Sequence, residues 1–161
     1  LMIGTSDVAF SPDASTTRGM IVAVLHRLEN QPVVSQENPF TDIKYGSYYE
    51  DAIAWAAANG IVEGYGDGSF EPDANITREQ MATILYRYAD YKGYDISVGG
   101  MSLYEYEDAV QISSYAVNAM QWANTEGLIE GRGNGNISPK DDATRAEIAA
   151  ILMRFCENIA G

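Results

Sequence analysis

The stretch from Glu71 to Tyr91, EPDANITREQMATILYRYADY, decides the fold, because its framework returns twice elsewhere in the chain. Within it, Thr77-Arg78 corresponds to Thr17-Arg18 and Thr144-Arg145, at offsets of 60 and 67 residues. A second arginine follows each pair at the same spacing. Six of the seven arginines therefore occupy two repeat positions: Arg18, Arg27, Arg78, Arg87, Arg145 and Arg154. Self-similarity at a nearly fixed period predicts a repeat architecture.

The repeated stretch has the pattern of an amphipathic helix with a marked start. Thr77 is a favourable N-cap residue, and Gln80 completes a capping box with it. The apolar residues that follow recur at three- and four-residue spacings, which predicts a helix over 78–91. Its apolar face consists of Met81, Ile84, Leu85 and Tyr88.

An Ala-rich segment precedes this helix in the middle and third copies. Residues 48–59 place apolar side chains at helical spacing, so we expect a helix there, and residues 115–126 repeat the segment. Gly60 stands where a left-handed cap residue belongs, and a glycine-rich turn leads on to Pro72. The first copy begins only at its turn. We expect residues 30–39 and 92–105 to be connecting loops.

Composition excludes several classes of function. Ten basic against 23 acidic residues give a net charge of -13, which argues against nucleic-acid binding. No apolar run approaches the roughly 20 residues of a membrane span, so no membrane insertion is expected. The single cysteine, Cys156, excludes an intrachain disulfide and a Cys-based zinc site. A calcium loop over residues 63–74 would end in Ala74, which cannot coordinate, so we expect neither metal nor cofactor.

Together these motifs resemble the S-layer homology module, a family that attaches bacterial surface proteins to the cell wall. The middle copy carries the family's elements in order, and the resemblance covers almost the whole chain. They are Phe40-x-Asp42, Tyr48-Tyr49, Gly60-Ile61-x-x-Gly64, Asp67-Gly68-x-Phe70-x-Pro72 and Ile76-Thr77-Arg78-Glu79-Gln80. The third copy has Asn134 for Asp67 and Ile137 for Phe70, and the first copy has no acid or amide at the capping-box position.

The resemblance implies an all-α fold of tandem helix-loop-helix repeats, in a pseudo-threefold arrangement around a central three-helix bundle. On this view residues 1–30 are the second half of module one, residues 31–95 are module two and residues 96–161 are module three. It also implies that grooves between the modules bind secondary cell-wall polysaccharide through a pyruvylated amino sugar, outside the cell at the bacterial surface.

Carried over by position, the family's Thr-Arg motif assigns ligand contact to Arg18, Arg78 and Arg145. The start of a helix presents unpaired N–H groups and partial positive charge, and an arginine there matches the carboxylate of a pyruvate ketal. The alternative is a salt bridge between copies, and the two roles can hold at different copies. The second arginines lie towards the helix C-terminus, where cations are favoured, so we interpret them as structural.

Two further pairs are candidate ligand residues. Asp42 and Asp108 precede the Ala-rich helices and could contact the ligand or brace the groove. Trp55 and Trp122 could stack on sugars, although their place in an Ala-rich helix favours the core.

The sequence therefore predicts a non-catalytic module that anchors a larger protein. One alternative is a protein-interaction module of the same fold, and another is a glycosidase with two carboxylates flanking the bond. The helix of the first copy also lacks its own Ala-rich segment. We therefore expect the apolar stripe Ile21, Val24, Leu25 and Leu28 to be covered either by the bundle or by a second chain in a homodimer.

Overall fold

The computed structural model describes residues 15–100 and 102–160, and in these ranges the chain is helical, which confirms the all-α prediction. The five α-helices are α1 (Arg18–Leu28), α2 (Glu50–Ala58), α3 (Arg78–Lys92), α4 (Val117–Thr125) and α5 (Arg145–Phe155). Three short 3-10 helices, η1 (Ser102–Glu105), η2 (Ala109–Gln111) and η3 (Ser114–Ala116), precede α4. A π-helical turn, η4 (Cys156–Ala160), follows α5. In the described part of the chain, no helix is long and apolar enough to cross a membrane.

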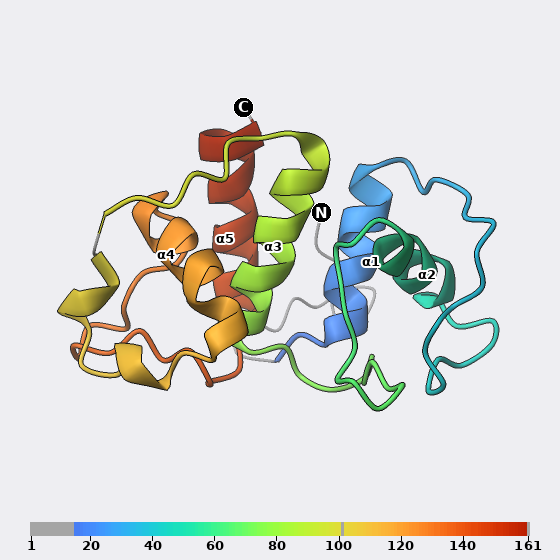
Figure 1. Ribbon diagram of the computed structural model, residues 1–161, viewed down its shortest axis with the longest axis horizontal. Coiled ribbons are helices and arrows are strands. Elements are labelled where there is room, and N and C mark those ends of the chain that lie inside the picture. Colours follow the sequence, from blue (N-terminus) through green and yellow to red (C-terminus); the bar gives the residue numbers. More distant parts are fainter. Residues whose placement is uncertain (1–14, 101, 161) are drawn as a thin grey trace.

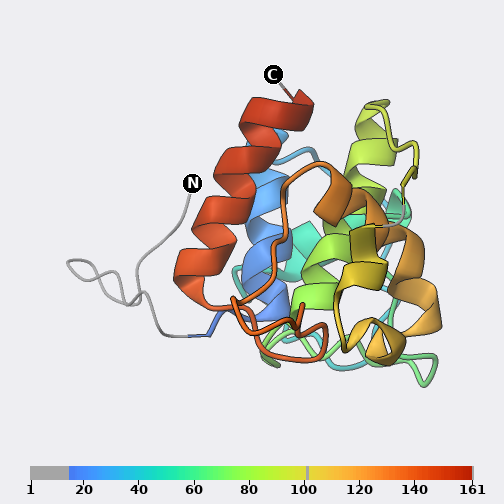
Figure 2. The same cartoon turned by 90° about the vertical axis from the view of Figure 1, so that its left-hand side faces the viewer.

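Helices α1, α3 and α5 run side by side with their N-terminal ends at the same end of the molecule (Figures 1 and 2). Each helix begins directly after the threonine of a Thr-Arg pair. The side chain of that threonine accepts a hydrogen bond from the third amide of the helix. The helix expected over 78–91 extends to Lys92, where Gly93 adopts a left-handed cap. The prediction that residues 92–105 are all loop is therefore wrong at both ends. Lys92 belongs to α3, and η1 occupies the last four residues of the segment.

The three copies are joined by isolated β-bridges at equivalent positions. Thr17 pairs with Asn75, Thr77 with Asp142, and Thr144 with Ser15. The first copy is thus bridged to the second, the second to the third, and the third back to the first. This cycle supports the pseudo-threefold arrangement, which stays a prediction, as do the module boundaries.

Helix packing crosses the boundaries between copies. Helix α2 packs on α1 and α4 packs on α3, so each Ala-rich helix covers the Thr-Arg helix of the preceding copy. The expectation that α1 lacks an Ala-rich partner is therefore wrong. Ile21 and Leu25 are fully buried and Val24 is nearly so, which leaves no exposed apolar stripe on α1.

The core lies where the two kinds of helix meet. Trp55 of α2 and Trp122 of α4 are among the largest fully buried side chains. The Trp55 ring packs against His26 and Tyr91, with ring centroids 5.2 and 5.8 Å away, and the Trp122 ring lies 5.5 Å from Tyr86. These packed aromatic side chains hold each Ala-rich helix against its neighbour.

Candidate functional site

Two equivalent grooves lie where one copy meets the next. Groove one holds Arg18 of the first copy against the second copy, and a pocket of about 290 Å³ is lined there by Arg18, Val62, Glu63, Gly64, Tyr65, Gln80, Thr83, Ile84, Arg87 and Tyr115. Groove two holds Arg78 against the third copy, in a pocket of about 300 Å³ lined by Arg78, Leu128, Ile129, Glu130, Gly131, Arg132, Ala146, Glu147, Ala150, Ile151 and Arg154. Most of the positions correspond at the repeat offsets.

Arg18 and Arg78, two of the predicted ligand residues, are buried in the walls of these grooves. Each is held by an equivalent hydrogen bond to a backbone carbonyl of the next copy. The Nε–H group of Arg18 donates to the carbonyl of Phe70 at 3.0 Å, and that of Arg78 donates to the carbonyl of Ile137 at 2.9 Å. Arg145 is fully buried in α5. The turn of the first copy, which corresponds by repeat position to the turns that hold Arg18 and Arg78, lies outside the described residues.

The prediction that the helix starts offer free N–H groups is wrong for α1 and α3. The backbone amide of Arg18 donates to the carbonyl of Ala74 at 2.9 Å, and that of Gly19 donates to Pro72 at 2.8 Å. The first two amides of α3 make the equivalent bonds to Asp141 and Pro139. Contacts between copies therefore satisfy the first two amides of α1 and of α3, which a helix leaves unpaired.

Asp42 and Asp108 brace the turns that carry these carbonyls. The carboxylate of Asp42 accepts the amides of Phe70 and Glu71 at 2.9 and 2.8 Å. The carboxylate of Asp108 accepts those of Ile137 and Ser138 at 2.9 and 2.8 Å. Glu71 and Ser138 both have the left-handed φ that few non-glycine residues adopt, 58° and 52°. Each aspartate thus fixes a strained turn, and with it the carbonyl that holds the arginine.

Close packing also explains one glycine in each turn. A Cβ atom on Gly64 would lie 2.7 Å from the ring of Phe40, and a Cβ on Gly131 would lie 2.6 Å from the ring of Tyr106. The lead-in aromatic residue therefore presses against the turn in both copies.

The surroundings of the two arginines differ. In groove two, Arg78 forms an ion pair with Glu147 at 2.5 Å and donates to the carbonyl of Glu130 at the same distance. In groove one Gln80 takes the place of Glu147, and it donates to the hydroxyl of Tyr65 at 3.0 Å. Within the described residues, no carboxylate forms an ion pair with Arg18. Its guanidinium lies over the rings of Phe70 and Tyr65, at 4.5 and 4.9 Å.

Desolvation acts on both buried cations. Burial lowers the pKa of Arg18, against the weaker raising effects of Tyr65, Tyr115, Glu71 and Asp42. Burial also lowers the pKa of Arg78, but there the adjacent Glu147 carboxylate opposes the shift. The charge on Arg18 is thus compensated mainly by rings and a carbonyl, so it would gain from an anionic ligand.

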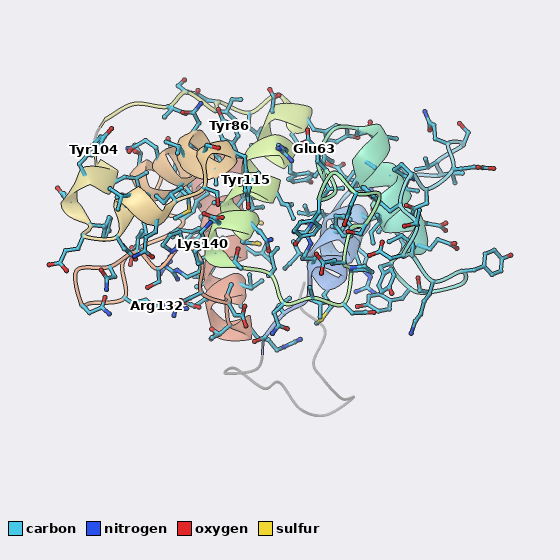
Figure 3. The ribbon with its side chains drawn as sticks, turned by 60° about the horizontal axis from the view of Figure 1, so that its bottom comes forward. Glu63, Tyr86, Tyr104, Tyr115, Arg132 and Lys140 are labelled. Carbon is cyan, nitrogen blue, oxygen red and sulfur yellow. The ribbon has the colours of Figure 1, made fainter. Side chains whose placement is uncertain are left out.

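Tyr115 brings the third copy into groove one. Its hydroxyl donates to the buried carboxylate of Glu79 at 3.2 Å, and Lys140 forms an ion pair with that carboxylate at 3.2 Å. Figure 3 shows Tyr115 and Lys140 on one face, with Arg132 farther along it. Burial and the charge of Glu79 raise the pKa of Tyr115 to about 12, while Arg18 opposes the shift.

Sequence reasoning missed several groove residues. Tyr65 and Tyr115 are about half exposed at the mouth of groove one. Trp55 and Trp122, candidates for stacking on sugars that the sequence favoured as core residues, are buried in the core. Arg87 and Arg154, interpreted as structural, also line the pockets. The sequence did contain a signal for these two residues, because they are separated by the same 67 residues as Arg78 and Arg145. Tyr65 carried no such signal, since Arg132 replaces it in the third copy.

Comparison with known proteins gives a consistent result. The sequence model of the S-layer homology domain family matches residues 39–82 and 105–149. An endoglucanase of Bacillus sp. (strain KSM-635) is 36% identical over 160 residues, which are 99% of this chain and 17% of that protein. The surface-layer 125 kDa protein of Lysinibacillus sphaericus is 32% identical over 123 residues, 74% of this chain and 10% of that protein.

A third relative is the cellulosome-anchoring protein of Acetivibrio thermocellus, which is 32% identical over 100 residues, 62% of this chain and 22% of that protein. The chain thus spans less than a quarter of the length of each of these three relatives.

Proposed function

This chain belongs to the S-layer homology domain family, and we propose that it is a non-catalytic module that anchors a larger protein to the cell wall. The family places it at the bacterial cell surface, since its relatives include surface-layer and cellulosome-anchoring proteins. The ligand proposed is secondary cell-wall polysaccharide, recognised through a pyruvylated amino sugar in the grooves between copies.

The observation that carries this proposal is the state of Arg18. The guanidinium is buried at the wall of an open pocket, is fixed by a carbonyl, and forms no ion pair with a carboxylate of the described residues. A sugar carboxylate would supply the missing charge through hydrogen bonds to a planar donor. Tyr65 and Tyr115 are at hand for the apolar face of a sugar ring.

Experiments can distinguish two alternative functions from glycan binding. A protein-interaction module would use the same grooves for a polypeptide and would not need wall polymer. A glycosidase needs a carboxyl group whose pKa is raised. Asp67 and Asp95 do not meet this requirement, because hydrogen bonds from Ser69 and Ser97 lower their pKa values.

A homodimer through the first copy stays a prediction, but its physical basis is weaker than the sequence implied. Helix α2 already covers the face of α1 that a second chain was expected to bury.

Cosedimentation with purified cell-wall sacculi tests the proposal. We expect the chain to pellet with intact sacculi and to remain in solution after the wall polymer has been stripped. Arg18→Ala should lose most of the binding, whereas Arg27→Ala, an exposed site on the same helix outside both grooves, should retain it. Equal pelleting with stripped sacculi would contradict the proposal, as would release of reducing sugar from the polymer.

A further inference from the structure

The equivalent residues Gln80 and Glu147 occupy the same place in the two grooves but leave the neighbouring arginines in different electrostatic states. Both residues complete a capping box, accepting the amide of Thr77 or Thr144 at 3.0 Å. Only Glu147 adds a charge. Its carboxylate contacts Arg78 at 2.5 Å through one oxygen and Arg132 at 2.7 Å through the other.

From this difference we infer that Glu147 is an internal competitor for anionic ligands in groove two, and that Gln80 makes groove one the stronger anion site. The inference rests on the proposed function, because it concerns the same grooves and the same carboxylate-bearing sugar. It assigns the difference in affinity chiefly to this repeat position, because the Arg132 that replaces Tyr65 in groove two is itself paired with Glu147 and Asp141.

The competition follows from the geometry of groove two. Arg78 directs its three nitrogens to the carbonyl of Ile137, the carboxylate of Glu147 and the carbonyl of Glu130. Arg132 is also committed, to Glu147 and to Asp141 at 3.0 Å. An incoming carboxylate must therefore displace Glu147 or bind beside it against charge repulsion.

Groove one lacks this obstacle. Gln80 is neutral and turns its amide to the hydroxyl of Tyr65, and no carboxylate of the described residues forms an ion pair with Arg18. Glu63, which lines this pocket, forms an ion pair with Arg87 at 3.5 Å and is largely exposed. An anion can therefore meet Arg18 without breaking an existing ion pair.

The chain itself supplies the matched variants for a test. Gln80→Glu and Glu147→Gln each install the residue found naturally at the equivalent position, and both residues support the same capping box. Either exchange should leave the fold intact, which helical circular dichroism can check. Should Glu147→Gln fail to fold, Gln80→Glu tests the inference alone.

Nuclear magnetic resonance of the arginine Nε–H groups reports on each groove separately. Both groups donate to buried carbonyls, which slows their exchange with water. The probe is a hexosamine bearing a 4,6-pyruvate ketal, and its methyl ester is the neutral control. We expect the Arg18 signal to reach half-saturation at a probe concentration at least tenfold lower than the Arg78 signal.

The exchanges should then move each groove towards the other. Gln80→Glu should raise the half-saturation concentration at Arg18 about tenfold, and Glu147→Gln should lower it at Arg78 by a similar factor. The methyl ester should bind both grooves weakly in all variants. If both signals respond at the same concentration and neither exchange changes it, the inference is overturned while the proposed function stands. If neither signal responds in any variant, both fail.

Discussion

Grooves one and two have the same framework but opposite electrostatic conditions. In both, an aspartate braces a strained turn, and a carbonyl of that turn holds a buried arginine. In groove two Glu147 neutralises Arg78, whereas in groove one Gln80 leaves Arg18 with aromatic neighbours. The comparison shows that the repeat preserves the scaffold of the arginine while the exchanges of Gln80 for Glu147 and of Tyr65 for Arg132 change its charge balance. Each prediction below tests either the shared scaffold or the difference.

The largest effect expected concerns the shared core. Trp55→Ala and Trp122→Ala should each lower the free energy of unfolding by about 3–5 kcal/mol, as for other buried aromatic side chains. Urea denaturation would measure both losses, which should be similar because the rings hold equivalent helices. A variant that unfolds like wild type but loses polymer binding would show that its Trp contacts sugar instead.

The next effect separates the arginines. Arg78→Ala should cost about 3 kcal/mol of stability, because it leaves the partly buried Glu147 without one of its cations and breaks bonds to two carbonyls. Arg18→Ala should cost about 1 kcal/mol, since it breaks one hydrogen bond to a carbonyl and a contact with two rings. Equal losses in urea denaturation would indicate that the two sites are electrostatically alike.

The braces should be equal in the two grooves. Asp42→Ala and Asp108→Ala each remove a carboxylate that accepts two backbone amides, and each should cost about 2 kcal/mol. Thermal unfolding of the two variants side by side is the measurement. Losses that differ by more than about 1.4 kcal/mol, a tenfold difference in the unfolding equilibrium constant, would show that the turns are not supported alike.

The smallest effect is the pH dependence that Glu147 adds in groove two. Burial raises the pKa of Glu147, but the hydrogen bond from Thr144 and the cations Arg132 and Arg78 outweigh it and lower the pKa overall. The stabilisation is therefore present above the ordinary glutamate pKa of about 4.3 and is lost as the pH falls through the lower, folded value.

Wild type should accordingly exceed Glu147→Gln by about 1 kcal/mol at pH 7, and the gap should close below about pH 4. Urea denaturation of both proteins at a series of pH values would measure it. A gap that widens in acid would contradict the assignment of the ion pair.

Much of this arrangement could be predicted from the repeat alone. The recurrence of Thr-Arg fixed the starts of α1, α3 and α5, and it singled out Arg18 and Arg78, which lie at equivalent places in the structure. Asp42 and Asp108 could be identified as a pair for the same reason. Local signals of this kind are strong because capping and periodicity act within a few residues.

Contacts between copies could not be predicted from such local signals. The carbonyls of Pro72 and Ala74 satisfy the first amides of α1, and α2 packs on α1 rather than within its own copy. These pairings are tertiary, so neither periodicity nor capping residues encode them. The exchange of Gln80 for Glu147 was visible in the sequence, but its consequence depended on the distance to Arg78.

Calorimetric titration with purified wall polymer tests the central claim most directly, that Arg18 in groove one binds an anionic wall glycan. Loss of a charged hydrogen bond of about 1.5–3 kcal/mol corresponds to affinity at least tenfold weaker. We therefore predict that Arg18→Ala binds the polymer at least tenfold more weakly than wild type, while Arg27→Ala binds like wild type. Equal affinities for wild type and a folded Arg18→Ala variant would contradict the account.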